Sequence, residues 1–166
     1  MTRSNILVAL VSLGFAGAFG CAQAPIIPGT KVPDTRLNRD LVQICEKYRH
    51  ALEDRDAETL FAMASPNYFE DSGTPKAEDD YGYEGLKQVI NARLAALKSV
   101  RFNIEYRGVE LQGNPGDKGS RAAVDIRYDA SFQISTELGD RWERKQNEKR
   151  LELESDGRQW KFVAGM

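Results

Sequence analysis

The chain has 166 residues, a formal net charge of −2 at pH 7 and 29% charged residues. This length suits one ordinary domain, which buries about 68% of the surface that its unfolded chain exposes. The near-neutral charge argues against nucleic-acid binding, because proteins that bind nucleic acids carry a strongly basic surface.

The N-terminal segment has the pattern of an export signal. Arg3 is followed by an apolar run over residues 6–19. This run is shorter than the roughly 20 residues that a membrane-spanning helix needs, and it matches the hydrophobic region of a signal peptide. We therefore expect residues 1–20 to be a signal peptide and the protein to be exported.

Residues 18–21 read Ala-Phe-Gly-Cys and resemble a bacterial lipobox, in which a small residue precedes the cysteine that becomes the lipidated N-terminus. The resemblance implies a lipid on Cys21 that anchors the protein to the cell envelope. Ala22 after the cysteine, rather than Asp, favours the outer membrane, facing the periplasm. Two alternatives stay open: ordinary cleavage after Ala24, next to the unfavourable Pro25, and an uncleaved apolar anchor.

The segment after the signal peptide is rich in proline and glycine. Residues 21–33 are therefore predicted to form a lipidated, semi-extended tether with little to pack, which leaves residues 34–166 as the folded domain. If Cys21 carries a lipid, Cys45 has no disulfide partner. Cys45 lies on an apolar helix face, so we expect a buried, unreactive thiol.

The first part of the domain predicts three helices. Asp34 is the expected N-cap of the first helix, which should run to about Arg55. Its apolar stripe is Leu37, Leu41, Ile44, Tyr48 and Leu52. Asp56 should cap a short second helix that ends before Pro66. The third helix is predicted from Leu86, Val89, Ile90, Leu94 and Leu97.

The second part of the domain predicts about four antiparallel strands. Alternating apolar residues predict a first strand over residues 100–111, with a β-bulge near Arg107, and three more over residues 122–165. We expect tight turns at residues 139–140 and 156–157. These turns place Tyr128 opposite Leu151 and Trp160 opposite Leu153. The result is an α+β layout, with the helices covering one face of the sheet.

This order of elements resembles the nuclear transport factor 2-like superfamily, which includes the ketosteroid isomerase and SnoaL-like families. The resemblance covers residues 34–164 and is carried by Tyr48 and by the segments 56–60, 68–71, 82–86 and 156–162. It implies a cone, in which three N-terminal helices pack on a curved antiparallel sheet of about four strands, with a pocket between the two layers.

The resemblance also implies two candidate catalytic residues. Isomerases of this superfamily use a tyrosine on the first helix as hydrogen-bond donor and an aspartate after the second helix as general base. Tyr48 and Asp71 stand near these positions. The second acid of those enzymes has no counterpart near Arg121. A structural alternative stays open for each residue, since Tyr48 lies on the core stripe and Asp71 suits a turn.

A second set of candidates suggests a ligand pocket. The expected hairpin puts Lys145 and Lys149 on the inner, apolar face of the sheet, where they could bind an anionic group. Tyr128, Phe132 and Trp160 would hold an apolar body. The alternatives are a sheet that extends past the helices, a β-bulge that reverses the pattern, and a homodimer face.

These features favour a membrane-tethered protein that binds a small apolar or anionic ligand, or a protein partner, without catalysis. The alternative is an isomerase or dehydratase of a small carbonyl compound that uses Asp71 and Tyr48. No metal or organic cofactor is expected. The acidic residues between Glu70 and Asp80 lack the fixed spacing of a calcium-binding loop, so they predict a solvated acidic loop.

Overall fold

The computed structural model describes residues 24–71 and 77–166. Three α-helices come first along the chain: α1 (Arg36–Glu53), α2 (Ala57–Met63) and α3 (Tyr83–Ala95). Two short strands pair between α2 and α3, namely β1 (Phe69–Glu70) and β2 (Tyr81–Gly82), and a 3-10 turn covers Ala77–Asp79. The main sheet consists of β3 (Leu97–Gln112), β4 (Arg121–Thr136), β5 (Gly139–Ser155) and β6 (Trp160–Ala164).

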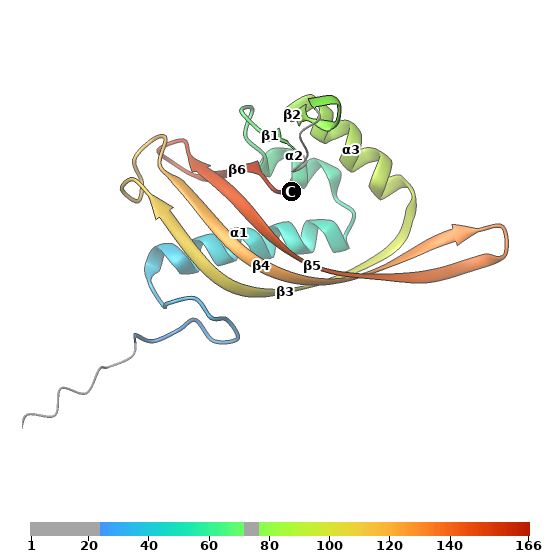
Figure 1. The fold of residues 1–166 in the computed structure, drawn as a ribbon, viewed down its shortest axis with the longest axis horizontal. Helices are drawn as coiled ribbons and strands as arrows, with labels where there is room; N and C mark the ends of the chain where they lie inside the picture. The colour runs from blue at the N-terminus through green and yellow to red at the C-terminus, as the bar shows by residue number, and fades with distance from the viewer. Residues whose placement is uncertain (1–23, 72–76) are drawn as a thin grey trace, which may run out of the picture.

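The main sheet is antiparallel with the strand order β3-β4-β5-β6, and it curves around α1 (Figure 1). The three helices lie on its concave side, and the end of the β4–β5 hairpin extends beyond them. This arrangement confirms the predicted α+β cone of three helices on about four strands. The pairing of β3 with β4 shifts between Tyr106 and Gly108, which confirms the predicted bulge.

The N-caps of the first two helices differ in how well the sequence predicted them. The side chain of Asp56 accepts a hydrogen bond of 3.0 Å from the backbone N–H of Thr59, as expected for the cap of α2. The predicted cap of α1 was wrong, because Thr35 caps that helix. Asp34 pairs instead with the guanidinium of Arg39. Helix α1 also ends earlier, at Glu53.

The predicted register of the sheet was wrong, although its faces were right. Thr136 pairs with Gly139, so the β4–β5 turn lies at residues 137–138 rather than 139–140. Tyr128 therefore lies opposite Asn147 instead of Leu151. This error moves the β4–β5 pairing by an even number of residues, so the side chains of these two strands stay on their predicted faces. The next turn is also longer than predicted, and Leu153 pairs with Phe162 instead of Trp160.

The core lies between α1 and the concave face of the sheet. Phe162 and Val124 are fully buried there, and Tyr48 is 5% exposed. Cys45 is also fully buried, and burial raises the pKa of its thiol to about 12, so the predicted unreactive thiol agrees with the structure.

The segment predicted to be a loose tether packs against the domain. Val32 is fully buried in the core, and the backbone N–H of Lys31 donates a hydrogen bond of 3.0 Å to the carbonyl oxygen of Tyr106. Ile26 forms a bridge with Pro33. Ile27 also packs against the core, so the packed unit starts before residue 34, and the expectation that residues 21–33 have nothing to pack is corrected for this part.

The outer face of the sheet carries cross-strand ion pairs. Arg144 pairs with Asp129, and Arg150 bonds to Asp125 at 2.8 Å. The sheet is thus buried on one face and solvated on the other, as its alternating pattern predicted. Within the described ranges, no helix has the length and apolar character needed to cross a membrane.

Candidate functional site

A cavity of about 480 Å³ lies between the helices and the concave face of the sheet. Helix α3 contributes Leu86, Ile90 and Leu94 to its wall, and the sheet contributes Phe102, Tyr128 and Phe132. The rings of Phe102 and Tyr128 are stacked, with centroids 5.1 Å apart. Most of the wall is therefore apolar and aromatic, as in pockets that bind small organic molecules.

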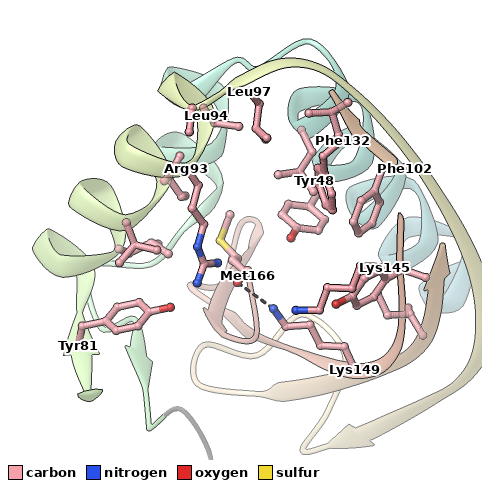
Figure 2. Close-up of a pocket in the computed structure, with 18 residues that line it drawn as sticks. Tyr48, Tyr81, Arg93, Leu94, Leu97, Phe102, Phe132, Lys145, Lys149 and Met166 are labelled. Carbon is pink, nitrogen blue, oxygen red and sulfur yellow. Dashed lines mark hydrogen bonds between the residues drawn. The ribbon is translucent and has the colours of Figure 1, made fainter. Parts of the chain in front are cut away.

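Tyr48 contributes a polar group to this apolar wall. Its ring packs against Phe162 and Phe102 at centroid distances of 5.4 and 6.4 Å, and Figure 2 shows its hydroxyl directed into the cavity. Burial raises the pKa of Tyr48 above its ordinary value, so the hydroxyl stays protonated. Tyr48 can therefore donate a hydrogen bond to a ligand.

Three basic side chains reach the cavity from two elements. Arg93 extends from α3, and Lys145 and Lys149 extend from β5 on the opposite side (Figure 2). We call these residues the cationic cluster. Arg93 and Lys145 are exposed, whereas Lys149 is half-buried. Because the cluster adjoins an apolar wall, the cavity can receive a molecule with an apolar body and an anionic group.

The surroundings of Lys149 lower the pKa of its side chain. Burial lowers its pKa, and the nearby charges of Arg93 and Lys145 lower it as well, while Glu70 acts in the opposite direction. Its ammonium nitrogen donates a hydrogen bond of 2.9 Å to the backbone oxygen of Met166 (Figure 2). This contact fixes the position of Lys149 in the cavity.

A hydrogen-bond network holds Met166 in place. The backbone N–H of Met166 donates to the hydroxyl of Tyr68 at 3.1 Å, and that hydroxyl donates to the carboxylate of Glu70 at 2.8 Å. The same carboxylate accepts a bond of 2.9 Å from the backbone N–H of Gly165. The residues after β6 are thus tied to β1, and through Met166 they position Lys149.

The structure brings together five of the site residues that the sequence suggested. Tyr48, Tyr128, Phe132, Lys145 and Lys149 all line the cavity. Two others lie elsewhere: Asp71 is exposed just after β1, and Trp160 packs against the core beside Ser155. Neither is among the residues that line the cavity. The structure therefore does not place Asp71 together with Tyr48 in one enclosed site.

Two further residues that line the cavity, Arg93 and Met166, were not predicted from the sequence. Arg93 follows Ile90 by three positions, so it lies on the apolar face of α3, and a cation within an apolar stripe could have been recognised as a pocket residue. No sequence pattern marks Met166 as a cavity residue, because its position depends on hydrogen bonds that Met166 and Gly165 make with Tyr68 and Glu70. Among the described residues, no group of three or more His, Cys, Asp or Glu side chains is arranged to hold a metal ion.

The fold is an α+β cone that encloses a cavity between its two layers. No protein-family model matches the sequence, and no curated protein matches it. Solved structures do match. Kfla4162 from Kribbella flavida superposes with a TM-score of 0.60 at 11% identity, over 77% of this chain and 86% of its own.

Two further neighbours carry names that describe an activity. One is a candidate scytalone dehydratase from Novosphingobium aromaticivorans, with a TM-score of 0.59 at 14% identity, over 78% of this chain and 80% of its own. The other is a candidate dehydratase of the NTF2-like family from Streptomyces avermitilis, with a TM-score of 0.57 at 12% identity, over 76% of this chain and 91% of its own. The chain therefore has the nuclear transport factor 2-like fold. At these identities the likeness concerns the fold alone.

Proposed function

We propose that this domain binds an amphipathic small molecule, with its apolar body in the cavity and its anionic group on the cationic cluster. The observation that carries the proposal is the position of Arg93, Lys145 and Lys149 around an otherwise apolar cavity. Like charges repel, and Glu70 is one negative charge beside three basic groups, so a bound anion would stabilise their arrangement further. The stacked Phe102 and Tyr128 offer a flat apolar surface for the remainder of the ligand.

Binding is favoured over catalysis by the arrangement of the two candidate catalytic residues. An isomerase or dehydratase needs a general base within hydrogen-bond reach of the substrate. Tyr48 faces the cavity, but Asp71 is exposed and outside its lining. We therefore propose a ligand-binding protein without catalytic activity, and we keep Asp71 as the residue whose substitution tests the enzymatic alternative.

The proposal includes a lipid anchor in the cell envelope, which rests on the sequence around Cys21. Cys21 lies outside the described residues, and Val32 is already buried in the core. A lipid on Cys21 would thus be connected to the packed domain by a short segment and would hold the cavity near the membrane surface. Replacing Cys21 with Ser should abolish labelling by a fatty-acid analogue and release the protein from the membrane fraction.

The charge preference of the cavity can be tested with two fluorescent probes of similar shape. One is the anionic 8-anilinonaphthalene-1-sulfonate, and the other is the neutral N-phenyl-1-naphthylamine. The double variant Arg93→Gln, Lys145→Gln should weaken binding of the anionic probe about tenfold, or roughly 1.4 kcal/mol, since both cations are exposed. Binding of the neutral probe should be unchanged.

The matched control is Lys47→Gln, which removes an exposed cation of α1. It should leave the binding of both probes unchanged. Added salt should weaken only the anionic probe, because exposed charges are screened. Equal loss of both probes in the double variant would show that the cations merely support the fold. Native mass spectrometry of the domain, with Asp71→Asn as comparison, would revive the enzymatic alternative if a co-purified molecule changed with the variant.

A further inference from the structure

We propose that Lys149 captures the carbonyl group of an anionic aldehyde or ketone by forming a reversible imine in the cavity. The proposal rests on the ligand site described above and goes beyond it, because it adds a covalent bond to binding by charge and apolar contact. It also differs from the enzymatic alternative, which assigns the chemistry to Asp71 and Tyr48.

The position of Lys149 suits a nucleophilic amine. It lies among cavity-lining residues, and it is half-buried, whereas Lys145, on the same strand, is exposed. Its nitrogen makes one hydrogen bond as a donor, to the backbone oxygen of Met166. A neutral amine can keep this bond and still direct its lone pair at a ligand. The contact holds the nitrogen in place, which reduces the entropy lost when the covalent bond forms.

Burial is the main cause of the lowered pKa of Lys149. Burial lowers its pKa most strongly, and Arg93 from α3 and Lys145 from β5 lower it further. Glu70 from β1 is the opposing charge. The hydroxyls that line the same cavity belong to three tyrosines, one each from α1, β2 and β4: Tyr48, Tyr81 and Tyr128.

The two other basic residues of the cluster can bind the anionic group of the ligand while Lys149 forms the covalent bond. The guanidinium of Arg93 and the exposed ammonium group of Lys145 can both hold the anionic group when Lys149 gives up its proton and attacks the carbonyl. Lysines that are desolvated and placed next to another cation are a recognised form of activated nucleophile.

The chemical step is balanced without an oxidant or reductant. The lone pair of the Lys149 nitrogen attacks the carbonyl carbon, and the carbon–oxygen π bond opens to give a carbinolamine. The carbon–oxygen bond then breaks and a carbon–nitrogen double bond forms. The carbonyl oxygen leaves as water with the two protons of the amine. Addition of water reverses the reaction and releases the ligand.

The experiment uses 4-carboxybenzaldehyde, which carries an aromatic ring, a carboxylate and an aldehyde. Sodium cyanoborohydride reduces the imine to a stable amine, and peptide mass spectrometry then identifies the modified lysine. We expect Lys149 to be labelled several-fold faster than the exposed Lys47. The labelling rate of Lys149 should also reach its half-maximum at a lower pH than that of Lys47, because its pKa is lowered.

Two variants separate this proposal from simple charge binding. Lys149→Arg keeps the positive charge but should abolish the fast labelling, whereas Lys145→Arg should preserve it. Binding of 4-methylbenzoate, which lacks the aldehyde, reports on the ligand site alone. If 4-methylbenzoate binds but Lys149 is labelled no faster than Lys47, the covalent proposal is wrong and the binding function stands. If neither compound interacts with the cavity, both proposals fail.

Discussion

The carboxylate of Glu70 accepts a hydrogen bond of 2.9 Å from the backbone N–H of Gly165, across 95 positions of the sequence. This bond ties β1 to the chain segment after β6, which supports the cavity through Met166. The backbone conformation of Gly165 and its close approach to β5 leave no room for a side chain. Its φ is +85°, and a Cβ atom at this position would lie 2.2 Å from the backbone oxygen of Arg150.

Gly165→Ala should therefore destabilise the protein by roughly 2–4 kcal/mol, from left-handed strain and overpacking together. The matched control is Gly139→Ala, where φ is +109° but a Cβ atom would meet nothing within 4 Å. That change should cost about 1–2 kcal/mol. Urea unfolding measures both values. If both variants lost the same free energy of unfolding, the backbone near Arg150 would have moved to accommodate the added methyl group without cost.

Phe162 is predicted to be a main determinant of stability. It is fully buried and its ring packs against Tyr48, so Phe162→Ala should lower the free energy of unfolding by about 3–5 kcal/mol. Leu138 is the matched control, because it is fully exposed at the tip of the β4–β5 hairpin. Leu138→Ala should change stability by less than about 0.5 kcal/mol. A loss below about 1 kcal/mol for Phe162→Ala would contradict the packing described here.

Asp129 should titrate at unusually low pH. Hydrogen bonds from Arg144, and then from Gln146, lower the pKa of its carboxyl group to about 2. A lowered folded-state pKa means that the unfolded chain binds the proton more readily. The contribution of Asp129 to stability is thus present above the ordinary value near 3.9 and is lost as the pH falls towards 2.

The matched test is an NMR titration of Asp129 in the native protein and in Arg144→Ala. The variant should raise the pKa of Asp129 towards its ordinary value, with Gln146 retaining part of the effect. Arg141→Ala, which removes a different exposed arginine of the same hairpin, should leave the titration unchanged. An unshifted curve in Arg144→Ala would mean that the ion pair does not persist in solution.

The contrast between the faces and the register of the sheet shows what the sequence could predict. Alternation with a period of two assigns each side chain to a face, so the inward position of Lys149 was predictable. The same alternation cannot distinguish registers that differ by an even number of residues. Arg150 illustrates this, because it meets an aspartate in either register: Asp129 in the predicted one and Asp125 in the observed one. Neither the apolar alternation nor this charge pairing therefore selects between the two registers.

The site residues divide in the same way. Tyr48, Lys145 and Lys149 lie in a regular helix and a regular strand, where the period of the element predicts which face each side chain is on. Asp71 follows a two-residue strand, and its direction depends on local backbone geometry that no period encodes. Contacts between distant segments, such as those of Glu70 with the end of the chain described here, leave no local pattern at all.

The negative charge of Glu70 raises the pKa of Lys149 and so opposes the effect of burial. Glu70→Gln keeps a hydrogen-bond acceptor for Tyr68 and Gly165 but removes the negative charge. The pKa of Lys149 should fall further, so a larger fraction of its amine is neutral at a given pH. Reductive labelling by 4-carboxybenzaldehyde should then be faster, with its pH profile moved to lower pH.

The control for this variant is Glu84→Gln, which removes an exposed carboxylate of α3 that pairs with Lys87. It should leave the labelling of Lys149 unchanged. Thermal unfolding of both variants checks that the fold is retained, since the isosteric Gln preserves the shape of the network. An unchanged pH profile in Glu70→Gln would show that Glu70 positions Met166 without acting on the charge of Lys149. A slower reaction would show that positioning through Met166 matters more than charge.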